Sequence, residues 1–284
     1  MNHVVVLTAS PLNGLSDLRI AEAMAMLEGA GAARRLSPDA AEIPVPHRQN
    51  PTLSGIDVNC IPAANRRKRL LIADMDSTII TVECIDEIAE AAGLRDQVQP
   101  ITEKAMRGEI PFEEALRARV ALLEGLEESQ LQAVHDARIR LMPGARALTA
   151  TMRAHGAYAA LVSGGFTFFT ERVAAEAGFD EHRANLLLAQ SGRLTGRVAE
   201  PVLGRRAKLD ALTEIAGRLG YPLADALAVG DGANDLEMIE AAGLGVAYHA
   251  KPVVAERADA SIRHGDLTAL LYLQGYSAAE IVTG

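Results

Sequence analysis

Two carboxylates stand one residue apart, directly after an apolar run. Asp74 and Asp76 belong to the segment DMDST, which follows LLIA at residues 70–73. A neighbouring like charge and desolvation both raise the pKa of a carboxyl group, so this pair is costly unless a divalent cation offsets the repulsion. The same residues could instead form a strand-end turn that caps a following helix, because Asp and Thr side chains accept hydrogen bonds from helix N-termini. The motif alone leaves a metal site and a helix cap open.

A second acidic segment, GDGAND at residues 230–235, also follows an apolar run. It supplies the carboxylates of Asp231 and Asp235 and the amide of Asn234, with glycines that let a ligand approach the backbone closely. Hard oxygen donors of this kind suit Mg²⁺, which usually binds through one or two carboxylates plus a phosphate. A glycine turn with a helix cap is the alternative for this segment.

Two further signals are compatible with phosphate binding. Ser163 and Gly164 lie in VSGG after the apolar run AYAAL, and a hydroxyl with exposed N–H groups at a helix start can cradle a phosphate. An ordinary strand-to-helix turn has the same composition. Lys208, in GRRAKLDAL, lies near the start of an expected helix, where most single lysines are simply solvated.

The segments around these motifs predict a doubly wound α/β fold. LLIAD, AYAALVSGG and ALAVGDG are apolar runs that end in small or acidic residues, as expected for strands buried on both faces of a parallel sheet. LGVAY and ADASI have the pattern of further short strands, and helical stretches separate most of these runs, at 145–155, 166–177, 208–219 and 235–242. Ligands of such sheets bind beyond the carboxyl ends of the strands, where the polar motifs lie.

Two segments interrupt the alternation of strands and helices. Residues 83–142 have a helical pattern throughout, with Ile85, Ile88, Ala89 and Ala92 at the spacing of one helix face. We interpret them as a small helical bundle inserted after the first core strand as a cap. The second interruption, NLLLAQSGRLTGRV, has the pattern of a β-hairpin.

A domain boundary is expected near residue 66. Residues 1–66 show one strand at 4–7 and one helix at 15–27, which predicts a small N-terminal α/β extension of unassigned role. The basic run RRKR that starts at Arg66 is expected to be a solvated linker or a strand entry. The rest of the chain, 67–284, forms the second domain, with a core made of 67–82 and 143–284 and the cap at 83–142.

Composition limits the possible functions. The chain has 284 residues, of which 49% are hydrophobic and 23% charged, as is typical of a globular protein. Its net charge of −9 disfavours nucleic acid as a partner, because binding DNA or RNA requires a surplus of Lys and Arg. No apolar stretch reaches the roughly 18 residues of a membrane span, and no signal peptide pattern opens the chain. Two cysteines without a CxxC pair suit a reducing compartment, so we expect a cytoplasmic protein.

The four motifs, in the order DxDST, SGG, Lys and GDGxND, resemble those of the haloacid dehalogenase superfamily of phosphohydrolases over about residues 68–270. With Glu83 included, the extended segments look like the phosphoserine phosphatase family in particular. The resemblance implies a Rossmann-like core with a helical cap. It also implies that Asp74 attacks phosphorus to form an aspartyl-phosphate, and that Asp76 acts first as general acid and then as general base. Mg²⁺ would bind Asp74, Asp231 and the backbone carbonyl of Asp76.

The same resemblance assigns roles to the other motif residues. Ser163, the N–H of Gly164 and Lys208 would hold the phosphoryl oxygens. Asn234 would belong to the substrate site and, together with Asp235, would support the metal and Lys208.

Substrate choice would come from the cap. A site selective for O-phosphoserine needs an acid for the ammonium and an Arg for the carboxylate. The resemblance assigns these roles to Glu83 and Arg119, and it places Met106 and Phe112 over the closed site. From spacing alone, Arg119 could equally extend to solvent, Glu83 could be a first-turn acid favoured by the helix dipole, and Met106 and Phe112 would be core residues.

The resemblance implies Mg²⁺-dependent hydrolysis of O-phosphoserine to serine, the last step of serine biosynthesis, by a monomer or homodimer whose partner is a small molecule. One alternative keeps the aspartyl-phosphate but passes the phosphoryl group to an alcohol such as homoserine, or acts on another small ester such as phosphohomoserine. A binding or regulatory protein with a decayed site is a third hypothesis, which the complete acidic set disfavours. The triplet Arg263-His264-Gly265 is found in histidine phosphatases, but no histidine follows it here.

Overall fold

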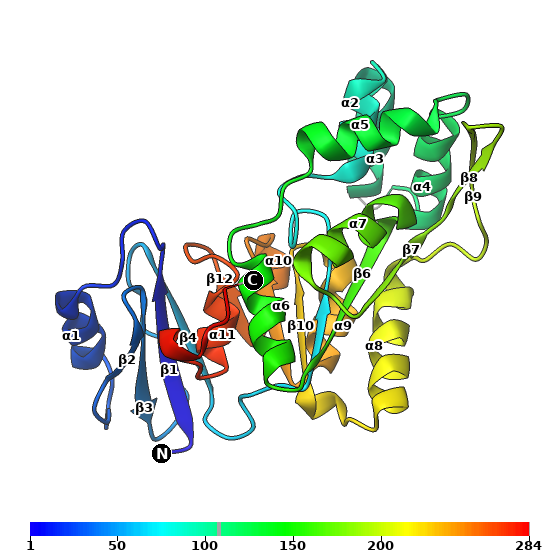
Figure 1. Ribbon diagram of the computed structural model, residues 1–284. Coiled ribbons are helices and arrows are strands. Elements are labelled where there is room, and N and C mark those ends of the chain that lie inside the picture. The colour runs from blue at the N-terminus through cyan, green and yellow to red at the C-terminus, as the bar shows by residue number, and fades with distance from the viewer. Residues whose placement is uncertain (107–108, 284) are drawn as a thin grey trace.

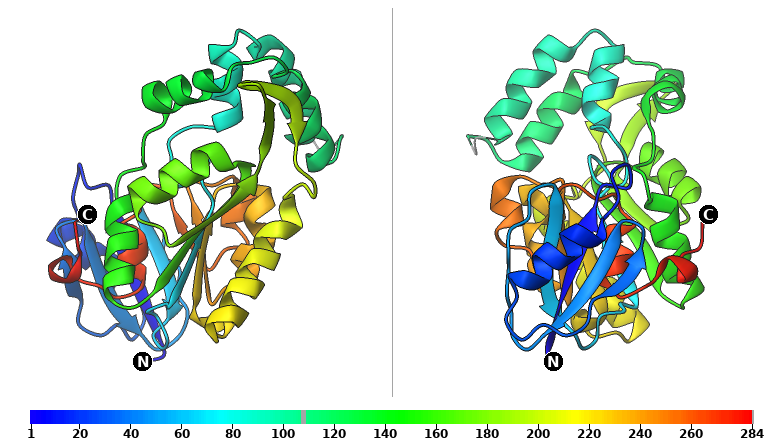
Figure 2. Two further views of the ribbon diagram at one scale, coloured as in Figure 1. Left: turned by 45° about the vertical axis from the view of Figure 1, so that its right-hand side comes forward. Right: turned by 90° about the vertical axis from the view of Figure 1, so that its left-hand side faces the viewer.

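The computed structural model describes residues 1–106 and 109–283, apart from the side chain of Met106. Figure 1 shows three parts: an N-terminal sheet, a larger sheet flanked by helices, and a group of helices at one end of that sheet. The two views of Figure 2 agree that the helical group lies at one end of the molecule and the N-terminal sheet at the side.

The larger sheet has six strands in the order β12-β11-β10-β5-β6-β7, and all its pairings are parallel. This confirms the predicted doubly wound α/β class. The central strands are buried on both faces because their side chains alternate between two apolar clusters: Leu71 and Ala73 of β5 enter one, Leu70 and Ile72 the other. The strand bounds are Leu70–Ala73 (β5), Tyr158–Phe166 (β6), Glu181–Asn185 (β7), Ala226–Gly230 (β10), Leu244–Tyr248 (β11) and Ala260–Ile262 (β12).

Helices cover both faces of this sheet (Figure 1). The cluster around Leu71 includes side chains of α6, α7 and α11, and the cluster around Leu70 includes those of α8, α9 and α10. Their bounds are Ala145–Ala154 (α6), Thr167–Ala177 (α7), Arg205–Leu219 (α8), Leu236–Ala241 (α9), Pro252–Ala255 (α10) and Ala269–Leu273 (α11). Helix α8 begins three residues before the predicted start, so Lys208 lies within its first turn.

The cap contains four helices, bounded by Cys84–Ala91 (α2), Arg95–Met106 (α3), Phe112–Ala121 (α4) and Glu128–Arg138 (α5). Its two connections to the core run side by side, with an antiparallel bridge between Ile80 and Leu141 and a 2.8 Å bond from Met142 N to Ile79 O. The two linkers between the core and the cap are therefore hydrogen-bonded to each other and are not independent loops.

A β-hairpin extends the cap. The pattern 185–198 predicts a hairpin and places it in the core, and strands Leu187–Gln190 (β8) and Arg193–Val198 (β9) do form one. The hairpin packs on α4, however, and Gly125 N donates to Leu194 O over 2.9 Å. Leu194 and Val198 are buried there, so contact with the cap helices decides where the hairpin lies.

The N-terminal region forms an antiparallel sheet in the order β2-β3-β1-β4. Its elements are His3–Ala9 (β1), Asp17–Ala25 (α1), Arg34–Ser37 (β2), Ala40–Val45 (β3) and Ile56–Pro62 (β4). The predicted strand and helix correspond to β1 and α1, while the other three strands were not predicted. Strand β1 alternates, with Val5 and Leu7 in the cluster that α1 covers and Val4 and Val6 in the large cluster shared with the second sheet.

Strand β4 binds the far edge of the larger sheet through two buried polar side chains. The Asp57 carboxylate accepts backbone N–H bonds from Arg263, His264 and Gly265 at 2.9, 3.0 and 2.9 Å. Asn59 accepts from Ser261 N at 2.8 Å and donates to Ser261 O at 3.1 Å. The RHG triplet is therefore a structural loop held by the N-terminal sheet.

The basic run leads directly into β5, so the expected strand entry is confirmed, and Arg67 and Arg69 are exposed, but the run is not solvated throughout. Lys68 is buried and donates to Ala224 O at 2.8 Å. Arg66 is partly buried and bonds to Glu42 and to backbone carbonyls near the C-terminus. These contacts fix the junction between the two sheets.

Among the helices that the structure describes, none combines the length and apolarity needed to cross a bilayer.

Candidate active site

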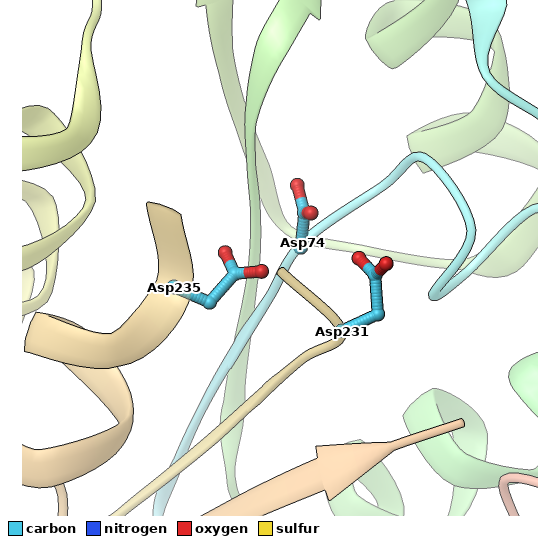
Figure 3. A group of neighbouring side chains, drawn as sticks. All are labelled: Asp74, Asp231 and Asp235. Carbon is cyan, nitrogen blue, oxygen red and sulfur yellow. The ribbon is translucent and has the colours of Figure 1, made fainter. Parts of the chain in front are cut away.

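Two neighbouring strands bring the acidic motifs together. Asp74 directly follows β5 and Asp231 directly follows β10, and these parallel strands pair with Ala73 opposite Val229. One ligand oxygen each of Asp74, Asp231 and Asp235 lies within 4.8 Å of the other two. Figure 3 shows the three carboxylates gathered between the loops that follow the two strands. Segments 157 residues apart in the chain, as 74 and 231 are, thus form one acidic site.

The electrostatics of this group fit a divalent cation. Burial raises the pKa of Asp74 well above its ordinary value, and the charge of Asp235 adds to the effect while Lys208 opposes it. Burial and then Asp235 raise the pKa of Asp231 to about 6. Carboxylates held this close in a sheltered site repel one another, and a bound cation would restore their ionised forms. Hard carboxylate oxygens are the ligands that Mg²⁺ prefers.

Lys208 is the cation that the chain itself supplies. Its Nζ lies 2.6 Å from Asp74 Oδ1 and 2.5 Å from Asp235 Oδ1, with all three side chains buried. Burial alone would lower the pKa of Lys208, but the carboxylates of Asp235 and Asp74 outweigh burial and raise it. The lysine therefore carries its charge inside the site.

Asp235 contacts Lys208 and also positions the backbone of the second acidic loop. Its Oδ2 accepts the N–H of Gly232 at 3.0 Å. A Cβ at Gly230 would lie 2.3 Å from Asp235 Cγ, so the glycine is required for this close approach. Asn234 is partly buried in the same turn, and its Oδ1 lies 2.3 Å from where a Cβ on Gly232 would be. Both of Asp235's oxygens are thus committed to positioning other groups.

The Asp76 side chain is held by the start of the cap and by the end of β6. Its Oδ1 accepts the N–H of Cys84 at 2.9 Å, and its Oδ2 accepts the Ser163 hydroxyl at 3.2 Å. Burial raises the pKa of Asp76, although these hydrogen bonds act in the opposite direction. A raised pKa is what a carboxyl group needs to deliver a proton near neutral pH.

The SGG segment lies within β6, where the pairing with β7 is irregular, and two further hydrogen bonds fix it. Gly165 N donates to Ser163 Oγ at 2.8 Å, and Asn185 Nδ2 donates to Gly164 O at 2.9 Å. Asn185 also accepts the N–H of Leu203 at 2.7 Å, which ties this segment to the residues before α8. Sequence analysis missed Asn185; its one signal is a polar amide at the end of a strand, on the sheet edge where the other motifs lie.

The cap reaches this site through Phe112 and Glu83. A Cβ on Gly164 would lie 2.9 Å from Phe112 Cζ, so the ring rests on the glycine. The Glu83 carboxylate accepts the Ser77 hydroxyl at 2.7 Å and lines a cavity of about 600 Å³ between the core loop and α2 and α3. Its surface remains open to solvent within the cavity. Partial desolvation by the cavity walls, followed by the charge of Asp76, raises the pKa of Glu83 to about 7.

Arg119 is buried on the cap rather than extended to solvent. Its side chain is 9% exposed, its Nε donates to Ala115 O, and its Nη1 donates to Thr102 Oγ1, each at 3.3 Å. Burial lowers the pKa of Arg119, and the charges of Asp86 and Glu83 counteract this. The predicted role of the Met106 side chain lies outside the described residues. The other predicted residues all lie around the junction of the core loops and the cap.

Comparison with known proteins places this site in a family. Residues 71–240 match the haloacid dehalogenase-like hydrolases. A phosphoserine phosphatase of Polaromonas sp. is 49% identical over 210 residues, which cover 72% of this chain and 89% of that protein. A phosphoserine phosphatase of Streptomyces coelicolor is 44% identical over 229 residues, but the match covers 80% of this chain and 56% of the relative's length.

The fold agrees with the sequence matches. A solved structure of a phospho-aspartyl intermediate analogue of phosphoserine phosphatase aligns with a TM-score of 0.68 and 40% identity, over 72% of this chain and 98% of that one. The chain therefore belongs to the haloacid dehalogenase-like hydrolases and, within them, to the phosphoserine phosphatase family.

Proposed function

We propose that this chain hydrolyses O-phosphoserine to serine and phosphate through a phosphorylated Asp74. The observation that carries the proposal is the meeting of Asp74, Asp231 and the charged Lys208 at the ends of β5 and β10. This arrangement places an anionic nucleophile, Asp74, beside the positive charge that is needed to bind an anionic phosphate.

Two displacements at phosphorus complete the reaction. An oxygen of Asp74 bonds to phosphorus as the bond from phosphorus to the seryl oxygen breaks. Asp76 donates its proton to the departing seryl oxygen. Asp76, now anionic, accepts a proton from water as the water oxygen attacks the aspartyl-phosphate. The P–O bond to Asp74 then breaks, releasing phosphate and restoring the carboxylate. Asp76 is suited to both steps because it lies partly buried two residues from Asp74 and has a raised pKa.

The phosphoryl oxygens would be held by Lys208, Ser163 and the N–H of Gly164, with Asn234 beside them. Mg²⁺ would bind the side chains of Asp74 and Asp231 and the backbone carbonyl of Asp76. When bound, it would neutralise phosphate charge so that an anionic carboxylate can approach. Asp235 would remain on Lys208 and Gly232, where both of its oxygens are already used.

Selectivity for an amino-acid ester would come from Glu83 and Arg119. Glu83 lines the cavity beside Ser77 and would bind the ammonium group, while Arg119 would bind the carboxylate. Phe112 packs on Gly164 and would shield the reacting phosphate from water, and we assign the same role to Met106.

The setting we propose is the cytoplasm, with the chain acting as a monomer or homodimer at the last step of serine biosynthesis. Cys60 and Cys84 are buried free thiols, which suits a reducing compartment. We propose that 1–66 is an extension and that 67–284 is the catalytic part, with its helical cap at 83–142, on which the hairpin of β8 and β9 packs.

A panel of phosphomonoesters tests the function. Phosphate release is measured from O-phosphoserine, phosphohomoserine and p-nitrophenyl phosphate, with Mg²⁺ and with EDTA. We expect the largest kcat/KM for phosphoserine and loss of turnover in EDTA that added Mg²⁺ restores. Adding homoserine separates hydrolysis from transfer, because a phosphotransferase would form phosphohomoserine in place of free phosphate. A higher kcat/KM for phosphohomoserine would contradict the substrate assignment.

A further inference from the structure

Thr102, on α3, is the only described side chain that receives a hydrogen bond from the guanidinium of Arg119. The other acceptor is Ala115 O, one turn earlier on Arg119's own helix. The Nη1 bond of 3.3 Å to Thr102 Oγ1 is therefore the hydrogen bond that connects the guanidinium to a different helix of the cap. Helices α3 and α4 pack against each other, so the bond crosses an existing helix contact.

The position of Thr102 relates Arg119 to the substrate cavity. Thr102 lines the cavity of about 600 Å³ together with Ser77, Glu83 and Asp86. The charges of Asp86 and Glu83 also act on Arg119, so the guanidinium is attracted toward these two acids of the cavity wall. If the guanidinium turned fully onto them, it would be lost to a ligand carboxylate.

The two hydrogen bonds leave one end of the guanidinium available. Nε already donates its hydrogen to Ala115 O, so a ligand carboxylate cannot bind through Nε. Nη1 donates one of its two hydrogens to Thr102. Among the described residues, Nη2 has no hydrogen-bond partner. A carboxylate can bind to the Nη1 and Nη2 end in bidentate fashion only if the plane of the guanidinium is fixed.

We propose that Thr102 is a positioning residue that holds Arg119 in the orientation required to bind the substrate carboxylate. The inference rests on the proposed function of the site. The Thr102 hydroxyl sets the plane of the Arg119 guanidinium and keeps the guanidinium from turning onto the cavity acids. It thereby determines preference between phosphate esters with and without a carboxylate, and takes no part in the phosphoryl transfer.

The test replaces the hydroxyl without changing the shape of the side chain. Thr102→Val keeps the branched volume and removes the acceptor, whereas Thr102→Ser keeps the acceptor. Thr213→Val is the matched control, because Thr213 is an exposed threonine on α8 whose hydroxyl bonds only to Leu209 O within its own helix. Arg119→Ala gives the result expected when carboxylate recognition is lost entirely.

Steady-state kinetics are measured with O-phosphoserine and with O-phosphoethanolamine, which is the same ester without the carboxylate. We expect Thr102→Val to raise KM for phosphoserine about fivefold or more with little change in kcat. The ratio of kcat/KM for the two substrates should fall by the same factor. Thr102→Ser should restore most of the ratio, and Thr213→Val should match the wild type.

Three outcomes would overturn the inference: an unchanged substrate ratio in Thr102→Val, an equal loss on both substrates, or failure of Thr102→Ser to restore the ratio. A melting curve for each variant identifies a folding defect, and the substrate ratio still decides in that case, because both kcat/KM values scale with the same folded fraction. Failure of the proposed function is distinguishable, because the wild type itself would then show no preference for phosphoserine over phosphoethanolamine.

Discussion

The ammonium group of Lys208 lies 2.6 Å from Asp74 Oδ1, with side-chain exposures of 3% and 6%. Burying a carboxylate without a partner favours its neutral form, which is a poor nucleophile. Lys208 counteracts this, and Asp235 in turn holds Lys208 from the other side at 2.5 Å. The three groups form one network whose net effect is to keep positive charge next to the reacting carboxylate.

Replacing Lys208 by Met is expected to lower kcat for phosphoserine by at least about 100-fold, because the positive charge on the developing phosphoryl oxygens is lost. The variant also leaves two buried carboxylates without their partner, and we expect a loss of about 3 kcal/mol in the free energy of unfolding. Steady-state assays of phosphate release measure kcat, and urea unfolding measures the free energy of unfolding. A variant with normal kcat and reduced stability would assign Lys208 a purely structural role.

The raised pKa of Glu83 predicts a pH dependence that belongs to one class of substrate. With a pKa of about 7, Glu83 is neutral below pH 7 and anionic above it. Only the anionic form attracts the substrate ammonium, so kcat/KM for phosphoserine should increase as the pH rises from about 6 to 8. Comparison with 3-phosphoglycerate, which carries a hydroxyl in place of the ammonium, removes the contribution of phosphate ionisation. In Glu83→Gln the two substrates should give parallel profiles; a persisting difference would point to another acid.

Asp57 is expected to contribute strongly to stability. Its buried carboxylate accepts three backbone N–H groups from the loop at 263–265, which would lose their partner in Asp57→Ala. Unpaired buried donors cost about 1–3 kcal/mol each, so we expect a total loss of about 3 kcal/mol after relaxation. Asp210→Ala, at an exposed ion pair on α8, is the control and should cost less than about 0.5 kcal/mol. Equal melting temperatures for the two variants would refute the anchoring role.

Strands β5, β6, β10 and β11 could be predicted from the sequence because each is largely buried and appears as an apolar run. The edge strand β7 was not predicted, because its sequence EHRAN contains no such run. Strands β2 and β3 could not be predicted, because β2 begins with the exposed residues Arg34 and Arg35 and β3 contains Pro44. Their pairing with β1 depends on neighbours in space rather than on local pattern. The same reason explains the hairpin, whose position on α4 no feature of its own residues could reveal.

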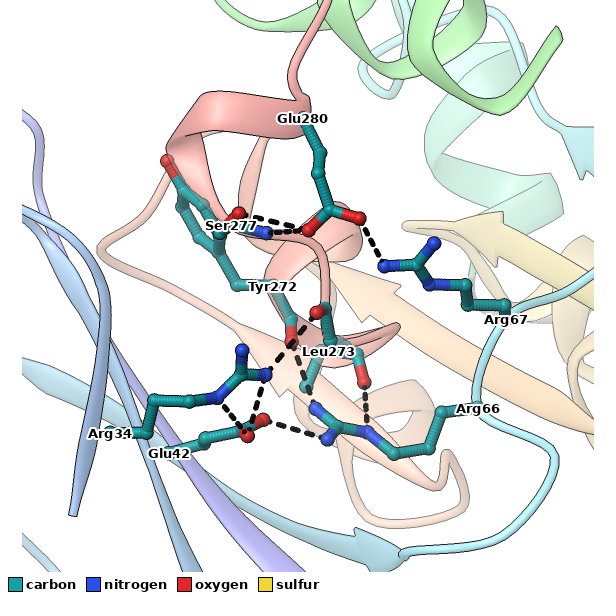
Figure 4. A network of polar contacts seen from close by, with 9 residues as sticks. Arg34, Glu42, Arg66, Arg67, Tyr272, Leu273, Ser277 and Glu280 are labelled. Atoms are coloured by element: carbon teal, nitrogen blue, oxygen red, sulfur yellow. Dashed lines mark hydrogen bonds and ion pairs between the residues drawn. The ribbon is translucent and has the colours of Figure 1, made fainter. Parts of the chain in front are cut away.

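The basic run shows how tertiary contacts change the meaning of charge. Local sequence predicts a solvated linker or a strand entry for Arg66 and its neighbours. Figure 4 shows instead that Arg66 bonds to Glu42 and to the carbonyls of Tyr272 and Leu273, while Arg67 pairs with Glu280. The partners come from both ends of the chain, so only the folded structure brings them together.

The site residues divide along similar lines. The residues of the acidic motifs, Ser163 and Lys208 are visible in the sequence because each follows an apolar run or begins a helix. Asn185 and Thr102 act through hydrogen bonds to groups far away in the chain, and single polar residues of these types carry no local signal. Motif residues are therefore predictable, and the residues that orient them depend on the fold.

The most direct test of the account is capture of the phosphoryl group on Asp74. Enzyme is mixed with O-phosphoserine labelled with ³²P, quenched in acid within one turnover, and digested for peptide mapping. We predict label on the peptide that contains Asp74, and neither label nor turnover above about one hundredth of wild type in Asp74→Asn. Label on a different residue, or phosphate release by Asp74→Asn at the wild-type rate, would contradict it.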